Sequence, residues 1–236
     1  MKKQLFLTLI ACFFTVASLT SQEQDSKTQT GTANFGVDLL AGSLFFKEEP
    51  KTATVIGTNI WFKIRCLENR RLRPWCIIFE TDIWWRPRMN DPWRKIFPIN
   101  VFPPRPPVGP WDKFNIEDLE LGNALVFSPS IGLQFGGERF KGSIYGGGGF
   151  QYTSGNESTM NGEKFRTTGR TAPLLTYGVS GRYFLKNNIS VRAQVGAMRI
   201  FESDFNIIGP DGSVGLFEGM ASTVPMVALG IGVGLN

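Results

Sequence analysis

Hydrophobic and polar positions alternate with a period of two along most of this chain. The alternation is plainest near the C-terminus, where bulky apolar residues hold one parity of 227–235 and alanine or glycine holds the other. Such alternation predicts β-strands with one apolar face, and no stretch has a convincing helical period. The predicted strands cover 34–47, 54–65, 76–85, 123–135, 139–152, 173–185, 189–201 and 223–236.

The connections between these stretches differ in length in a regular way. Tight turns are predicted at 136–138 and 186–188, whereas long connections are predicted at 86–121, 153–172 and 202–222. Membrane barrels have short turns on the periplasmic side and longer loops on the outer side. The pattern therefore predicts an all-β, antiparallel, up-and-down transmembrane barrel of eight strands. Two connections depart from it: 48–51 is short for an outer loop, and 66–75 is long for an inner turn.

The N-terminal segment 1–21 is typical of a secretory signal peptide, with two lysines, an apolar run and small residues near its end. A lipoprotein signal ending at Cys12 is the alternative. Residues 22–32 are expected to form a flexible leader, and 33–236 one barrel domain. No later segment reaches the ~18 apolar residues that a membrane helix needs, so any crossing is made by strands.

The eight alternating stretches, the export signal and the unequal connections resemble the small eight-stranded outer-membrane β-barrel proteins of the OmpA/OmpX/OmpW type. The resemblance covers residues 34–236 and carries no catalytic motif. It implies a monomer embedded in the lipid of the cell outer membrane.

Histidine is absent from the sequence. This excludes imidazole acid–base catalysis, Ser-His-Asp triads and imidazole metal sites. We therefore expect no enzyme activity, no catalytic residues, no bound metal and no cofactor. The formal charge of +5 is a mild excess that predicts no nucleic-acid partner.

Two cysteines remain once the signal peptide is removed, and we expect them to form one disulfide, Cys66–Cys76, in an oxidising compartment. The apolar faces of the two strands match when Phe62 pairs with Phe79 and Ile64 with Ile77. In that register the cysteines are not opposite each other. The disulfide then requires a β-bulge or a place in the turn itself, and we interpret it as a staple on the 67–75 turn.

Charged residues occupy the inward parity of several predicted strands. We expect them to pair inside the barrel as a structural plug, since an unpaired buried charge is costly. The alternative is a selective pore or a ligand pocket. The glycines of the last strand are expected to leave room for two of the arginines. The predicted interior cluster comprises Lys63, Arg65, Glu80, Asp82, Lys141, Arg182 and Arg192.

The connection 86–121 is rich in proline, tryptophan and arginine, and eight of the chain's fourteen prolines lie between Pro87 and Pro110. Proline stiffens the backbone, and tryptophan and arginine often anchor interfaces. The segment is predicted to be an outer docking loop for an envelope protein or a surface glycan, or else part of an aromatic belt at the membrane interface. The candidate residues are Trp84, Trp85, Arg86, Arg88, Trp93, Arg94, Arg105 and Trp111.

The leading functional hypothesis is a non-enzymatic outer-membrane barrel with a structural or interaction role through its long outer loop. A narrow porin is the first alternative. A soluble periplasmic barrel that binds a small apolar ligand is the second.

Overall fold

A computed structural model describes residues 34–45, 52–69, 72–87, 122–137, 139–160, 162–185, 188–217 and 221–235. The predicted signal peptide and leader, and residues 88–121 of the predicted docking loop, lie outside these ranges. The statements below concern the described residues.

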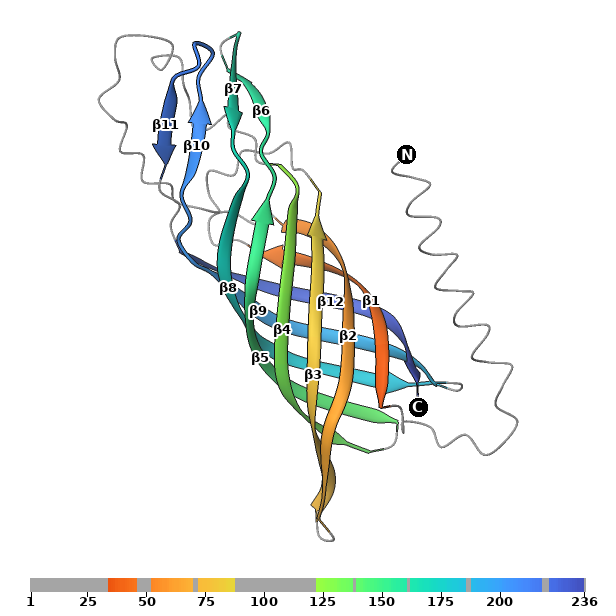
Figure 1. Cartoon of the computed structure of the whole chain (residues 1–236). Helices are drawn as coiled ribbons and strands as arrows, with labels where there is room; N and C mark the ends of the chain where they lie inside the picture. The colour runs from red at the N-terminus through yellow and green to blue at the C-terminus, as the bar shows by residue number, and fades with distance from the viewer. Residues whose placement is uncertain are drawn as a thin grey trace.

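Eight antiparallel strands close into a barrel (Figure 1), which confirms the predicted fold class. Around the barrel the order is β1-β12-β9-β8-β5-β4-β3-β2. The barrel strands are β1 (Phe35–Phe45), β2 (Thr52–Asn69), β3 (Leu72–Arg86), β4 (Ala124–Gly136), β5 (Phe140–Thr153), β8 (Arg170–Phe184), β9 (Ile189–Ile200) and β12 (Ser222–Leu235).

The barrel closes between its first and last strands. Phe35 of β1 pairs with Leu235 of β12 on one side and with Phe62 of β2 on the other. The backbone N–H of Asn34 donates to the carbonyl of Leu235 at 2.9 Å. β1 therefore starts and β12 finishes at one end of the barrel, which we call the terminal end; the opposite end is the loop end.

No helix in the described ranges is both long enough and apolar enough to cross a membrane.

The outward face of the barrel is apolar on every strand. Exposed aromatic side chains mark its two edges, as in membrane barrels. Phe35 and Phe45 on β1 are ten residues apart, as are Phe140 and Phe150 on β5. With strands tilted by about 40°, ten residues span about 25 Å of bilayer, the height of the apolar band of such barrels. The terminal-end girdle comprises Phe35, Phe62, Trp75, Phe135, Phe140 and Tyr183, and the loop-end girdle Phe45, Trp85, Phe127, Phe150 and Tyr152.

The β2–β3 hairpin is longer than predicted. Its pairing continues to Asn69 and Leu72, so the predicted long inner turn is mostly paired strand. A register shift between Lys63 and Arg65 places one extra residue in β2. A β-bulge was one of the two arrangements open to the disulfide. The interpretation as a staple on the 67–75 turn is wrong, because most of that turn is paired strand.

The disulfide follows directly from that bulge. Cys66 now pairs with Cys76, and their Cα atoms are 4.0 Å apart with an S–S bond of 2.07 Å. Phe62 pairs with Phe79 as predicted, with ring centroids 5.0 Å apart. The predicted pairing of Ile64 with Ile77 is wrong, because the bulge gives Arg65 that place.

Two of the predicted outer loops contain strands that the sequence pattern did not reveal. β6 (Glu157–Met160) and β7 (Glu163–Thr167) form one hairpin, and β10 (Phe205–Ile208) and β11 (Val214–Phe217) form another. The hairpins join through β7 and β10 into a four-stranded sheet of order β11-β10-β7-β6. In Figure 1 this outer sheet stands beyond the loop end of the barrel.

Glycines in β5 bring neighbouring strands close together. A Cβ on Gly147 would overlap the carbonyl oxygen of Pro129, and one on Gly149 that of Phe127. Because these positions carry no side chain, Ser128 of β4 reaches Thr176 of β8, with their hydroxyl oxygens 2.6 Å apart. The glycine run of β5 thus allows its neighbouring strands to approach closely.

Candidate functional site

The middle of the barrel lumen holds a buried charge network centred on Arg192. Its guanidinium donates to both oxygens of Glu80, at 3.2 Å and 2.9 Å, and to Asp38 Oδ2 at 3.3 Å. It also donates to the side-chain oxygen of Asn59. Arg182 donates to the same Asp38 oxygen at 2.6 Å. The four ionised side chains are at most 3 % exposed, so the pairs are formed in a site closed to water.

A second branch of the network surrounds Asp82. Its two carboxylate oxygens accept from Asn59 Nδ2 at 2.7 Å and from Gln194 Nε2 at 3.1 Å. Gln194 Nε2 also donates to the Tyr145 hydroxyl at 2.8 Å. The two amide side chains therefore bind Asp82, while the arginines bind Asp38 and Glu80.

The network spans the full width of the lumen. In the barrel order, β9 and β3 are separated by four steps in either direction, so they are opposite walls. Arg192 and Gln194 belong to β9, and their partners Glu80 and Asp82 belong to β3. Side chains from opposite walls thus meet at the barrel axis.

A glycine in the last strand makes room for this network. Asp38 pairs with Gly232, and a Cβ on that glycine would overlap Asp38 Oδ1. We predicted space for Arg182 and Arg192. The nearest side chain to Gly232 is instead the carboxylate that binds both arginines.

Toward the terminal end, aromatic side chains close the lumen below the charges. Trp61 and Phe184 are in edge-to-face contact at 6.4 Å, and Arg182 stacks over the Trp61 ring at 4.2 Å. Lys63 and Lys141 follow on the inward parity and are partly exposed.

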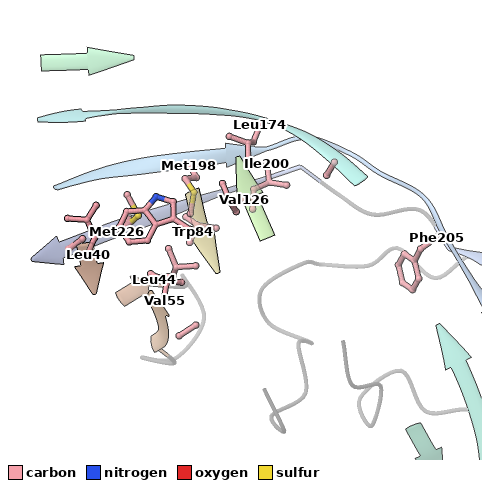
Figure 2. Close-up of a cluster of buried hydrophobic side chains, with 14 of the residues drawn as sticks. Leu40, Leu44, Val55, Trp84, Val126, Leu174, Met198, Ile200, Phe205 and Met226 are labelled. Atoms are coloured by element: carbon pink, nitrogen blue, oxygen red, sulfur yellow. The ribbon is translucent and has the colours of Figure 1, made fainter. Parts of the chain in front are cut away.

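Toward the loop end, a cluster of apolar side chains follows the charged network (Figure 2), and Arg86 and Arg170 are buried at that end too. Leu40, Trp84, Leu174, Met198 and Met226 are each at most 2 % exposed. The cluster continues to Phe165, Phe205, Ile207 and Phe217 of the outer sheet. The lumen is therefore filled by an aromatic layer, a charged layer and an apolar layer.

The structure corrects three of the predicted positions. Arg65 is exposed on the outer face, because the bulge before it reverses the parity of β2. Trp84 and Arg86 belong to β3 and point into the barrel at 2 % and 4 % exposure, so they are not part of a docking loop. Trp85 faces outward in the loop-end girdle. The remaining loop candidates, Arg88, Trp93, Arg94, Arg105 and Trp111, lie outside the described residues.

The other residues that we predicted for the barrel interior do lie in the lumen. Glu80, Asp82, Arg182 and Arg192 form the network, and Lys63 and Lys141 lie at its terminal-end rim. Asp38 and Asn59 were missing from the predicted cluster. Asp38 is a single polar residue among apolar ones and Asn59 directly follows Thr58, and the inward parity of each strand was the available signal.

The outer sheet has one buried and one exposed face. Phe165, Phe205 and Phe217 face the buried side, and the Phe205 and Phe217 rings stack at 5.8 Å. On the exposed side Lys164 Nζ lies 2.7 Å from Glu157 Oε1. This hydrogen-bonded pair lowers the pKa of Glu157 and raises that of Lys164.

Two further features of the outer sheet face solvent. Val214 and Leu216 on the edge strand β11 are 60 % and 56 % exposed. An open depression of about 440 Å³ lies between the tips of the two hairpins, where it is lined by Lys164, Arg166 and Pro210 among others.

Within the described ranges, no group of three or more histidine, cysteine, aspartate or glutamate side chains is placed to hold a metal ion.

No family model and no curated protein matches this sequence. Solved structures that match in fold include a major outer membrane protein from Thermus thermophilus (TM-score 0.48, 11 % identity, covering 85 % of this chain and 99 % of that one). The outer membrane protein OprG from Pseudomonas aeruginosa also matches, with a TM-score of 0.43 and 13 % identity, covering 89 % of this chain and 100 % of that one. The outer membrane protease OmpT from Escherichia coli matches with a TM-score of 0.43 and 8 % identity, covering 89 % of this chain and 99 % of that one. At these values the likenesses assign no activity to this chain.

Proposed function

We propose that this protein is a non-conducting, non-enzymatic outer-membrane barrel that holds an interaction surface outside the bilayer. The barrel would act as the membrane anchor, and the outer sheet with its neighbouring loops would make the contacts. The observation that carries the proposal is the bridging of opposite lumen walls by Arg192 and Glu80.

A pore needs a continuous path of water through the lumen, and the side chains leave little room for one. An eight-stranded barrel is only just wide enough for its own side chains. Here Arg192, Glu80 and Asp38 are fully buried, and the apolar layer beside Trp84 would disfavour a passing ion. Both features support a plug over the narrow porin.

The exposed apolar belt argues against the soluble periplasmic barrel. Residues such as Ile131, Ile144 and Leu229 are 57–63 % exposed on the outer face of the barrel. Exposed apolar surface of this extent is costly in water and matches a lipid environment.

The outer sheet is the part of the described structure best suited to contact a partner. It lies at the loop end, beyond the loop-end girdle, and presents Val214 and Leu216 on its edge strand β11 and charged side chains on β7 and β6, across β10. Apolar side chains with a charged border are typical of protein interfaces. We expect an envelope or extracellular protein partner there, and a surface glycan as the alternative.

The plug is tested by conductance in planar lipid bilayers. We expect no stable channel from the wild-type protein at neutral pH, and none from a control such as Arg166→Gln on the outer sheet. The triple variant Arg192→Ala/Glu80→Ala/Trp84→Ala removes side chains from two lumen layers and should conduct if it folds, which heat-modifiable migration on gels checks. Stable, ion-selective conductance by the wild-type protein would contradict the proposal.

A further inference from the structure

The terminal end of the barrel carries exposed positive charge without exposed negative charge among its described side chains. Arg65 and Arg139 are exposed there. The described carboxylates of this half, Asp38, Glu80 and Asp82, are all buried in the lumen network. At the loop end, by contrast, exposed cations and carboxylates are mixed, as in the Lys164–Glu157 pair.

Both exposed arginines lie beside the terminal-end girdle. Arg139 directly precedes the girdle residue Phe140, and its carbonyl accepts from the backbone of Phe184 at 2.7 Å. Arg65 pairs with Ile77, between the girdle residues Phe62 and Trp75 of the two strands. Aromatic girdles mark the boundary between hydrocarbon and headgroups, so both guanidinium groups are within reach of the headgroup layer.

The bulge and the disulfide fix Arg65 in this position. Without the extra residue in β2, its side chain would point into the lumen, as the uninterrupted alternation predicts. The Cys66–Cys76 bond directly follows Arg65 and ties the two strands together. The outward direction of this cation is thus built into the hairpin.

The hairpin also reaches the right depth. From Cys66 to Asn69 its paired strands extend three residues beyond the disulfide, or about 10 Å of strand. The headgroup layer adds about 5–8 Å to each side of the hydrocarbon core. The projecting hairpin, visible at the terminal end in Figure 1, therefore ends near the outer limit of that layer.

We infer that the terminal end of the barrel, through Arg65 and Arg139, binds the phosphate groups of anionic phospholipids in the leaflet that faces the chain termini. The half-buried Lys63 and Lys141 at the lumen rim add to the positive potential. Guanidinium groups match phosphate in shape and charge, and basic residues next to a bilayer attract anionic lipid. The inference rests on the membrane-spanning barrel and not on the plugged lumen.

The test is a titration of short-chain phosphatidylglycerol onto the folded protein in zwitterionic micelles. Phosphatidylcholine of the same chain length and inorganic phosphate serve as competing probes. We expect phosphatidylglycerol to bind more tightly than both. Arg65→Gln/Arg139→Gln should weaken it about fivefold for each arginine, the factor that corresponds to about 1 kcal/mol per basic residue near the surface. Arg65→Lys/Arg139→Lys should retain most of the binding.

The matched control is Lys164→Gln/Arg166→Gln, which removes two exposed cations from the opposite end and should leave the affinity unchanged. Equal binding of both lipids, equal binding of inorganic phosphate, or an equal loss in the control would each overturn the inference. The inference would also be overturned if the protein bound isolated cell-wall sacculi through Arg65 and Arg139 but did not bind phosphatidylglycerol. None of these variants is expected to conduct. A negative result in the lipid titration is therefore distinct from a result that contradicts the plugged lumen.

Discussion

Two ion pairs of similar length lie in opposite environments in this protein. Arg192 and Glu80 meet at 2.9 Å inside the lumen, where both side chains are fully buried. Lys164 and Glu157 meet at 2.7 Å on the outer sheet, where the side chains are 73 % and 54 % exposed. Loss of one partner costs less in the shorter pair, because water and salt screen an exposed charge, whereas a buried charge that loses its partner has no substitute.

The comparison also separates the two parts of the molecule by their tolerance of change. In the lumen Arg192 binds side chains of three other strands and Asp38 binds both arginines, so a substitution at either residue disturbs several walls of the barrel. On the outer sheet the pair joins two strands that backbone hydrogen bonds already connect. Substitutions should therefore reduce stability little on the surface that would meet a partner and much more in the plug.

Removing the central arginine should have the largest effect. Arg192→Met would leave Glu80 and one side of Asp38 without a cation in a closed site, and we expect a loss of about 4 kcal/mol in unfolding free energy. Urea unfolding in detergent micelles, followed by tryptophan fluorescence, measures it. The double variant Arg192→Met/Glu80→Gln should recover part of the loss, since it removes both charges. A double variant whose loss equals the sum of the single losses would show that the two residues do not interact.

A methyl group placed beside the network should have a smaller effect. Gly232→Ala would force its Cβ against Asp38 Oδ1 and the carbonyl of Val37, and overpacking of this kind costs about 2 kcal/mol. Gly137→Ala is the matched control, because nothing lies within 4 Å of the Cβ it would add. If both variants unfold at the same urea concentration as the wild type, the close fit of Asp38 against β12 is not needed for stability.

Much of the barrel could be predicted from the sequence because period-two alternation is a local signal. The eight barrel strands are long enough, at eleven to eighteen residues, to show it several times over. The strands of the outer sheet have four or five residues each, too few for a period to stand out. Their pairing joins β7 to β10, about forty positions apart, and the local alternation of apolar and polar residues does not indicate such a contact.

Within the lumen, the inward parity identified most of the charged residues but not their partners. A single bulge was enough to move Arg65 from the lumen to the lipid face, and alternation alone does not reveal where a bulge falls. Trp84 lies within the predicted strand 76–85 and Arg86 directly after it; the strand continues to Arg86, so both side chains follow its inward parity. Which carboxylate meets which arginine depends on strands far apart in the sequence, and only the closed barrel defines it.

The exposed pair should give the smallest effect, and one that depends on pH. Lys164 lowers the pKa of Glu157 below its ordinary value of 4.5 through a hydrogen bond and its charge. A carboxylate whose pKa is lowered on folding stabilises the fold above its ordinary pKa, and that contribution disappears as the pH falls through the lowered value. Carbon-detected NMR titration of the Glu157 carboxyl should therefore show a midpoint below 4.5, and Lys164→Gln should move it upward. Glu157→Gln should leave unfolding in urea at pH 7 nearly unchanged, because the pair is open to water. A change in stability as large as that of Arg192→Met would mean that solvent exposure does not separate the two ion pairs.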